Sequence, residues 1–374
     1  MKYKDYQVTV TDNPIEANAI THAGTFHMDE CMATVIIAKV CQCHVKVYRT
    51  TKGAEAIDRP MCVVYDVGGG EFDHHMPGGN GARPNGVQYA ACGLIWKKYG
   101  RTAVNRILQA NNIECSTENV DWLWDYVDRE LIQGIDANDT GTMPDREFPC
   151  NCLDISGIIR LMNVRWDYKP DITYLPDKSR TEERQVSIED RMFLKAVKMA
   201  ARIFDFVVDY AVSSLRAKTS VEKALNDAMC RVASRDEDAI TKSHIMILDS
   251  YLPWLDHIFN MDTDDLRALA ERIIYVVYPA KRGGYQFRVV PMAKGSYDQR
   301  NHVPDSWLGL KDEELAAVCG VEDATFVHQN GFIGGAKTLD GAIAMASTAI
   351  DYGTINPDYA ASTKHVDTED PHET

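Results

Sequence analysis

Histidine and aspartate side chains recur in three short segments of the N-terminal part of the chain. The first segment runs from His22 to Glu30, the second ends at Asp66, and the third is the triplet at 73–75. Carboxylate oxygens and imidazole nitrogens are ligands that suit Mn²⁺, Mg²⁺, Zn²⁺ or iron. The residue types and their clustering therefore predict a metal site, and the first hypothesis is a metal-dependent hydrolase.

The elements that must position these residues read as an α/β pattern. Residues 29–40 predict a helix, residues 44–49 alternate like a strand, and residues 61–65 form an apolar strand that stops at Asp66. Strand, helix and strand in this order indicate a doubly wound parallel sheet. Because ligands of such sheets collect at the carboxyl ends of the strands, the candidate ligands are expected along one sheet edge.

Later segments predict further helices and a second sheet. Residues 87–99 form an apolar-faced helix that should end at Gly100, and a long helix should begin at Ser187 after a polar, proline-bearing stretch at 170–183. Farther on, residues 272–278 and 286–290 predict a hairpin with a glycine-containing loop.

The last part of the chain predicts one more strand and a helix. Residues 325–328 form the strand, and Thr338 is placed to cap a helix over residues 340–350. The glycines between these two elements permit close backbone approach. The final residues, 353–374, are polar, acidic and weakly patterned, so a disordered tail is expected there.

These motifs carry a resemblance. The run His22-Ala-Gly-Thr-Phe-His27-Met-Asp29-Glu30, an isolated aspartate at a strand end and the triplet Asp73-His74-His75 resemble the DHH phosphoesterase superfamily. With Val327-His328 and the glycines up to Gly335, the chain is similar to the melanocyte-proliferating-gene-one (MYG-type) branch of that superfamily. The motifs occur in order over residues 17–350, so the resemblance covers nearly the whole chain.

The resemblance implies a binuclear site that holds two divalent metal ions, Mn²⁺ first and Mg²⁺ as the alternative. The implied metal ligands are His22, His27, Asp29, Asp66, His74 and Asp136, with Asp139 as the alternative to Asp136. Asp66 would bridge the two ions. His75 would contact the phosphate, and Asp73 would orient His74 from behind.

The C-terminal part resembles the DHH-associated C-terminal domain, which implies a substrate-binding role. The implied substrate-binding residues are His328, Gly334, Gly335, Lys337 and Arg300. Further cations that could hold a nucleic acid locally are Lys281, Arg282, Arg288 and Lys294. A plain β-turn in a small mixed sheet is the alternative interpretation of the glycine motif.

Composition bounds the architecture. With 374 residues, 45% of them hydrophobic, the chain can bury more than one core. We expect a DHH-type metal-binding phosphoesterase domain over 1–185, a helical connector over 186–270, a smaller mixed α/β DHH-associated domain over 271–352 and the tail. The N-terminus lacks an apolar signal core and no segment could span a bilayer, so we expect a cytoplasmic protein without membrane contact.

Charge and resemblance together bound the function. A formal net charge of -15 argues against broad electrostatic capture of nucleic acid, so a nucleic-acid substrate must be held locally. The resemblance implies a metal-dependent phosphodiesterase, a 3'-5' exonuclease preferring RNA, with single-stranded DNA as a possible substrate and a homodimer as a possible assembly. The alternatives are a small-molecule phosphohydrolase and a non-catalytic, metal-stabilised scaffold. Retention of every expected ligand argues against the scaffold.

Overall fold

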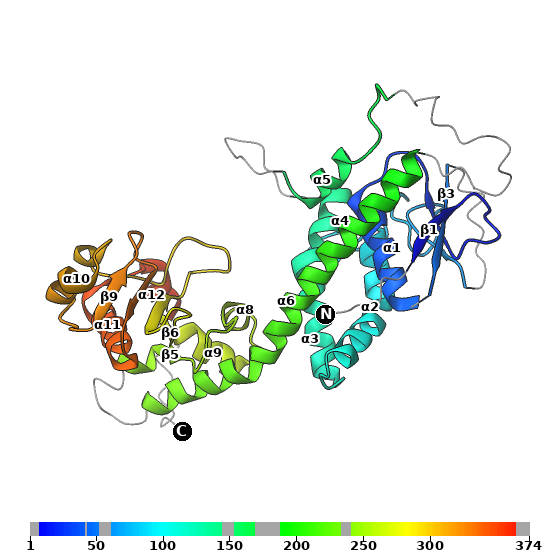
Figure 1. Ribbon diagram of the computed structural model, residues 1–374. Coiled ribbons are helices and arrows are strands. Elements are labelled where there is room, and N and C mark those ends of the chain that lie inside the picture. Colours follow the sequence, from blue (N-terminus) through cyan, green and yellow to red (C-terminus); the bar gives the residue numbers. More distant parts are fainter. Residues whose placement is uncertain are drawn as a thin grey trace. The chain divides into compact units, whose positions relative to one another are not determined.

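The computed structural model describes residues 7–41, 43–51, 61–143, 153–168, 188–232 and 241–363. The chain divides into two compact units, residues 1–212 and residues 213–374 (Figure 1). Each unit is described by itself. No helix of the described residues is long and apolar enough to cross a membrane.

The N-terminal unit is built on a four-stranded sheet in which every strand pairing is parallel. The strands lie in the order β1 (Val8–Thr11), β3 (Val45–Thr50), β2 (Ala19–His22) and β4 (Val63–Val64). With the helices that connect these strands, this sheet confirms a mixed α/β fold with a parallel sheet. The carboxyl ends of β2 and β4 lie at the same sheet edge, because parallel neighbours end on the same side.

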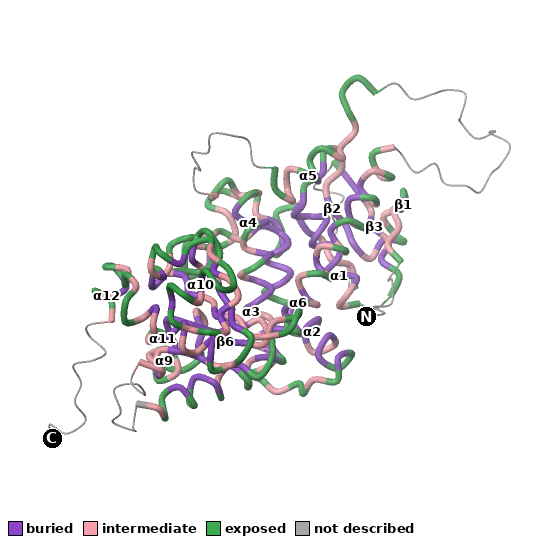
Figure 2. The backbone as a smooth tube through the Cα atoms, turned by 60° about the vertical axis from the view of Figure 1, so that its left-hand side comes forward, coloured by how far each residue is buried: buried purple, intermediate pink, exposed green. Residues whose placement is uncertain are grey.

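The helix that follows β2 is buried around its whole circumference. In α1 (Met28–Cys41), every residue from 28 to 38 is buried (Figure 2). It packs against α2 (Ala91–Ala110), which also contributes a buried face. A helix enclosed on all sides needs no polar stripe. The two acidic residues at its start, Asp29 and Glu30, are therefore buried as well.

Helix α2 does not end where the sequence indicated. Gly100 lies within α2, which continues to Ala110, so the predicted helix end at Gly100 was wrong. A Cβ atom at Gly100 would lie 2.7 Å from the Trp124 indole nitrogen and 2.7 Å from Trp96. The glycine serves close packing between α2 and α3 (Thr117–Val127), and not chain termination.

Three helical segments join into one rod that ends at the candidate metal centre. Helix α3 runs into a π-helical turn, η2 (Asp128–Ile132), and then into α4 (Gln133–Asp139). A π turn changes the direction in which later side chains point, and such turns recur at functional sites. A short helix, α5 (Ile155–Leu161), follows and packs on α1.

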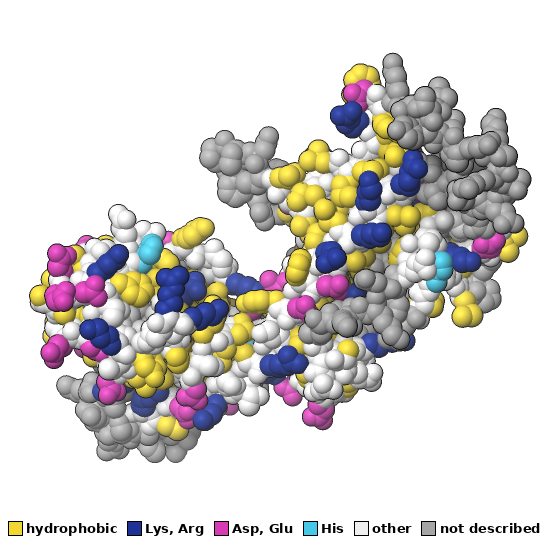
Figure 3. All heavy atoms as spheres, viewed as in Figure 1, with side chains coloured by type: hydrophobic (Ala, Val, Ile, Leu, Met, Phe, Trp, Pro, Cys, Tyr) yellow, Lys and Arg dark blue, Asp and Glu magenta, His cyan; other side chains and the backbone are white. Residues whose placement is uncertain are grey.

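Helix α6 (Ile188–Val232) is the long helix that the sequence predicted, although its expected first residue, Ser187, and the stretch 170–183 lie outside the described residues. Its N-terminal part belongs to the first unit and its C-terminal part to the second. Figure 3 shows Lys, Arg and hydrophobic side chains together on one face of the N-terminal unit.

The C-terminal unit contains a five-stranded mixed sheet. Its strand order is β5 (Ile245–Ile247), β6 (Tyr275–Pro279), β7 (Tyr285–Val289), β10 (Ile333–Ala336) and β9 (Ala324–Val327). Only β5 and β6 pair in parallel; the other pairs are antiparallel. The predicted hairpin is confirmed by β6 and β7, and β9 confirms the predicted later strand.

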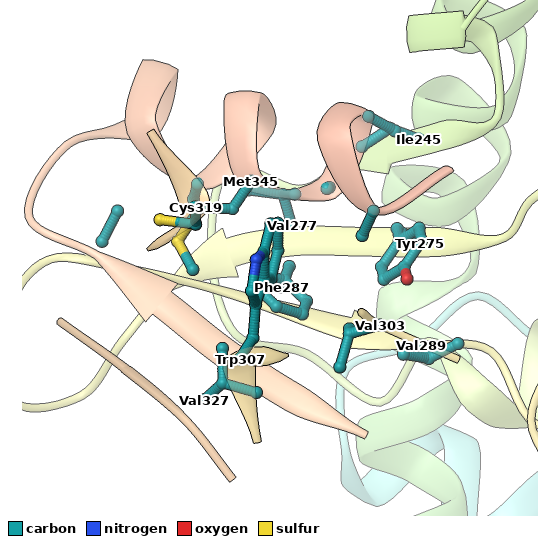
Figure 4. Close-up of a cluster of buried hydrophobic side chains, with 14 of the residues drawn as sticks. Ile245, Tyr275, Val277, Phe287, Val289, Val303, Trp307, Cys319, Val327 and Met345 are labelled. Carbon is teal, nitrogen blue, oxygen red and sulfur yellow. The ribbon is translucent and has the colours of Figure 1, made fainter. Parts of the chain in front are cut away.

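One helix covers a face of this sheet. Helix α11 (Leu339–Tyr352) confirms the predicted C-terminal helix, and the Thr338 hydroxyl accepts a hydrogen bond from Gly341 N at 3.0 Å, as a capping residue does. Figure 4 shows Met345 of this helix among Val277 and Phe287 of the sheet. The remaining elements are α8 (Leu255–Ile258), α9 (Asp264–Arg272), β8 (Asn301–His302), η4 (Asp305–Trp307), α10 (Asp312–Cys319), β11 (Thr354–Ile355) and α12 (Pro357–Thr363).

The beginning of the expected tail differs from the prediction. Residues 354–355 form β11, which pairs with β8, and residues 357–363 form α12. Tyr359 is buried, and its hydroxyl donates to Glu271 O at 2.9 Å. One buried aromatic side chain orders this polar stretch, whereas residues 364–374 lie outside the described residues.

Candidate metal centre

Two parallel strands bring the first pair of site residues together. The β2–β4 register sets Ile20 opposite Val64, so His22, the last residue of β2, reaches the level of Asp66. The distance from His22 Nε2 to Asp66 Oδ2 is 3.2 Å. The expectation that these residues meet at the sheet edge agrees with this geometry.

Asp66 is the most informative residue of the site. Its side chain is 1% exposed, and neither carboxylate oxygen accepts a hydrogen bond among the described residues. Its backbone lies in the left-handed region, with φ of 57°, which a non-glycine residue adopts at a cost. Around it stand three imidazoles, of His22 (3.2 Å), His75 (3.4 Å) and His74 (3.5 Å). A buried carboxylate without donors is costly unless a cation binds it.

A second buried carboxylate, Glu30, also faces His22. Glu30 Oε1 lies 3.1 Å from His22 Nε2, and both Glu30 oxygens accept from His27 N at 2.9 Å. Burial acts to lower the pKa of His22, but the carboxylates of Asp66 and Glu30 outweigh it and raise the pKa to about 11. The pocket therefore favours positive charge at this point. The sequence contained Glu30 within the motif, yet its role as a neighbour of the site was missed.

Asp29 performs two tasks at once. Its oxygens accept from Ala91 N (3.0 Å) and Cys92 N (2.7 Å), so it caps α2, whose own preceding residue, Ala90, has no capping side chain. Burial, followed by the charges of neighbouring aspartates, raises the pKa of Asp29 well above its usual range. Asp29 also offers a ligand atom within 4.8 Å of those of His74 and Asp139.

The structure separates the two aspartates between which the resemblance left a choice. Asp139 Oδ2 lies 3.0 Å from His74 Nε2, and its Oδ1 lies 3.8 Å from His27 Nδ1. Asp136, although within ligand range of Asp29 and Cys92, has its oxygens occupied. Asp139 thus faces the imidazoles of His27 and His74, whereas Asp136 faces Arg83 and the start of α2.

Asp136 belongs to a buried ion-pair network. Arg83 donates from Nη1 to Asp136 Oδ2 at 2.7 Å, and from Nε and Nη2 to the two oxygens of Asp128 at 2.8 and 2.7 Å. The other Asp136 oxygen accepts from Gly93 N at 3.1 Å. Burial raises the pKa of Asp136 to about 6, against the lowering effect of Arg83. Arg83 and Asp128 had no role in the sequence interpretation.

Within the triplet at 73–75, Asp73 contacts a different histidine from the one that the resemblance implied. His75 donates from its backbone nitrogen to Asp73 Oδ1 at 3.0 Å, and its Nδ1 lies 2.9 Å from the same oxygen. Asp73 Oδ2 accepts from Gly69 N at 2.7 Å. Asp73 therefore orients His75, and not His74 as the resemblance implied, because the turn directs its carboxylate toward the second following residue. His75 is 61% exposed on its side chain, whereas His74 is 10% exposed.

Two contacts fix the loop that carries His27. Asn163 Oδ1 accepts from Phe26 N at 2.9 Å, and Asn163 Nδ2 donates to Phe26 O at 2.8 Å. Arg49 Nη2 donates to Gly24 O at 2.8 Å. The loop between β2 and α1 is held from both sides, which preorganises its imidazoles.

A cavity of about 770 Å³ opens beside these residues within the N-terminal unit. His27, Asp29, His74, His75 and Asp139 line it from the metal-site side. Such a volume lies in the range of small-molecule and nucleotide sites. The site thus has two features: acidic and imidazole groups that could hold a metal ion, and an adjoining cavity with space for a substrate.

The residues expected to bind substrate lie in the C-terminal unit and have different environments. Arg300 is buried and donates to the carbonyls of Ala270 (2.8 Å) and Ile273 (2.6 Å), so it completes the end of α9. Burial lowers the pKa of Arg300, and its hydrogen bonds to these carbonyls give it a role within the fold. His328 is exposed, and its ring lies 4.7 Å from that of Phe332.

The two glycines of the motif are strand residues and not loop residues. A Cβ atom at Gly334 would lie 2.4 Å from the Phe287 ring, and one at Gly335 would lie 2.7 Å from Tyr285 O. Packing within the sheet therefore already requires glycine at both positions. Lys337 is exposed and lines a cavity of about 440 Å³ together with Arg282.

Comparisons with known proteins place the chain in a family. Residues 18–350 match the MYG1_exonuc family, described as "Uncharacterised protein family (UPF0160)". The chain belongs to this family. No solved structure matches it.

Two relatives illustrate the similarity. The chain is 28% identical over 355 residues to a MYG1 protein of Saccharomyces cerevisiae, covering 88% of this chain and 94% of the relative. It is 26% identical over 347 residues to the MYG1 exonuclease of Homo sapiens, covering 88% of this chain and 85% of the relative.

Proposed function

We propose that this protein is a divalent-metal-dependent nuclease of the DHH phosphoesterase superfamily. The observation that carries the proposal is the environment of Asp66, a buried carboxylate with no hydrogen-bond donor and three imidazoles within 3.5 Å. The relatives named MYG1 exonuclease support a nuclease as the enzyme class. A doubly wound N-terminal domain belongs to the same proposal.

The donor set of the site fits divalent cations. Carboxylates and imidazoles together suit Mn²⁺ and also accept Mg²⁺ or Zn²⁺. The residues that would hold two ions are His22, His27, Asp29, Asp66, His74 and Asp139. Bound ions supply charge neutralisation and orientation of the phosphate oxygens.

The chain's own residues account for the remaining tasks. His75, exposed at the cavity and oriented by Asp73, is placed to donate a hydrogen bond to a phosphate oxygen. An Nδ1–H that donates to Asp73 leaves Nε2 available for the substrate. Asp136 and Arg83 hold the helix that carries Asp139, and they do not contact the phosphate.

The proposed activity is removal of nucleotides from RNA in the 3'-5' direction. The direction of digestion and the preference for RNA rest on the resemblance of the motifs to the MYG-type branch. To test it, purified protein and Mn²⁺ are incubated with RNA and single-stranded DNA labelled at the 5' or the 3' end. Ladders that shorten from the 3' end, stronger with RNA, are the expected result. A panel of pyrophosphate and cyclic dinucleotides separates this activity from a small-molecule phosphohydrolase.

Two matched variants test the metal assignment in the same assay. Asp139→Asn should lower bound Mn²⁺, measured by plasma mass spectrometry, whereas Asp136→Asn should keep it and lower stability. Inactivity of the wild-type protein across the whole panel would contradict the proposed function. Equal loss of metal from both variants would contradict the choice of Asp139.

A further inference from the structure

Arg160 of α5 stands out among the residues around the cavity beside the candidate metal centre. It is the only Lys or Arg that lines this cavity in the described part of the chain. Asp29, Asp139 and Asp154 line the same cavity, together with the three imidazoles at 27, 74 and 75. A polyanionic substrate therefore meets mostly acidic and imidazole groups here, and one guanidinium.

The Arg160 guanidinium is also available. Within the described ranges, no carboxylate lies at ion-pair distance from it. Two other arginines of the unit, by contrast, are paired: Arg165 with Asp167 at 3.2 Å, and Arg129 with Asp125 at 2.6 Å. Asp154, which shares the cavity, instead accepts from Gly157 N at 2.6 Å. A cation left unpaired in an acidic cavity is free to bind an anionic ligand.

The helix that carries Arg160 is fixed relative to the metal centre. The side chain of Ile159, a residue of α5, is fully buried. Asn163, just after the helix, exchanges two hydrogen bonds with Phe26, whose neighbour is His27. Ser156 lies one turn before Arg160 and lines the same cavity, so one face of α5 forms that wall.

We infer that Arg160 binds a second phosphate of the substrate, one nucleotide away from the phosphate that is cleaved. This inference rests on the proposed function. The cleaved phosphate must lie at the metal ligands, and α5 supplies none of them. A cavity of about 770 Å³ has room for a nucleotide beyond that phosphate. A guanidinium matches a phosphate with two parallel hydrogen bonds.

The inference predicts that the protein prefers substrates in which two phosphates are separated by one nucleoside. The test compares three RNA dinucleotides that share one internal phosphate: one without a terminal phosphate, one with a 5'-phosphate and one with a 3'-phosphate. Binding to the full-length protein is measured by calorimetry, with Ca²⁺ in place of Mn²⁺ and the integrity of each dinucleotide checked by chromatography. The wild-type protein should bind one phosphorylated form about 10–100-fold more tightly than the unphosphorylated form.

Three variants locate that preference. Arg160→Ala should abolish the gain from the terminal phosphate and leave binding of the unphosphorylated dinucleotide unchanged, and Arg160→Lys should keep part of the gain. Arg165→Ala is the matched control, because its exposed side chain does not line the cavity, and it should behave like wild type. The inference is overturned if no terminal phosphate improves binding, if Arg160→Ala keeps the gain, or if that variant weakens all three ligands equally.

A separate readout distinguishes this inference from the proposed function. Bis(4-nitrophenyl) phosphate contains a single phosphodiester, so its hydrolysis with Mn²⁺ reports the metal centre alone. If the wild-type protein cleaves it and Arg160→Ala cleaves it equally well, the proposed function stands whatever the dinucleotides show. If the wild-type protein fails on this ester and on the nucleic-acid panel, the proposed function fails.

Discussion

Two regions of the N-terminal unit contain buried carboxylates, and the hydrogen bonding of these carboxylates differs between the regions. In the Arg83 network, the guanidinium contacts Asp128 and Asp136 at 2.7–2.8 Å, and the side chains are at most 7% exposed. Around Asp66, the carboxylate is as deeply buried but receives no hydrogen bond among the described residues. In the first region a guanidinium hydrogen-bonds the carboxylates, whereas in the second only histidine rings stand beside the carboxylate.

This difference distinguishes a carboxylate that stabilises the fold from the carboxylate that we propose as a metal ligand. Two anions beside a buried Arg already have their charge compensated and their oxygens hydrogen-bonded, so binding a further cation there would cost these hydrogen bonds. Neither Asp66 oxygen accepts a hydrogen bond among the described residues, and its neighbours are imidazoles, which bind metals when neutral. In the sequence, the aspartates of both regions are isolated residues and look alike. The hydrogen bonds that they accept in the structure distinguish the two kinds.

The largest effect is expected from Asp66→Asn. This variant should show no measurable turnover and no bound Mn²⁺ by plasma mass spectrometry, because it removes the charge that both ions would share. Full metal content in this variant would break the comparison, because Asp66 would then be as structural as Asp136.

The next effect concerns stability and not metal. Arg83→Met leaves two buried carboxylates without their partner, so the free energy of unfolding should fall by about 3–5 kcal/mol in urea titrations. Arg101→Ala is the control: its pair with Asp121 is half exposed on both sides and should cost less than about 1 kcal/mol. Equal costs for the two variants would show that the Arg83 network does not anchor the fold.

The sequence predicted the Asp66 region better than the Arg83 region. A parallel strand ending at an aspartate places that residue at the sheet edge, and local pattern is enough to see it. Arg83 contacts Asp136 across 53 positions of sequence, and no local pattern indicates such a pair. The choice between Asp136 and Asp139 also depends on the π turn at 128–132, which changes the helical phase before α4.

Other differences have similar causes. Gly100 carried the signal of a helix end, but two tryptophans from neighbouring turns and helices need the space that a side chain would fill. Arg300 carried the charge of a phosphate-binding residue, and its Nη1 group donates to backbone carbonyls at the end of α9. In each case tertiary packing gives the residue a structural role that its type alone does not indicate.

A smaller effect on stability is expected at Gly93, which lies against Asp136 of the Arg83 network. A Cβ atom there would lie 1.8 Å from Asp136 Oδ2, so Gly93→Ala should lower the free energy of unfolding by about 1–3 kcal/mol. Gly134→Ala, a helical glycine with open space around its Cβ position, should be neutral or stabilising by up to about 1 kcal/mol. Urea unfolding of both variants gives the comparison. A neutral Gly93→Ala would mean that Asp136 can move.

The smallest effect tests how far the Asp66 region extends. Asp73 touches His75 through two hydrogen bonds and contacts no other imidazole at such distances among the described residues. Asp73→Asn should therefore lower kcat by about 10-fold, the low end for a residue that orients a histidine, with metal content unchanged. In a His75→Ala background, the same substitution should add almost nothing, because both changes remove one oriented imidazole. A fall in bound Mn²⁺ in the single variant would place Asp73 behind His74 instead, and additive effects in the double variant would give Asp73 a role that does not pass through His75.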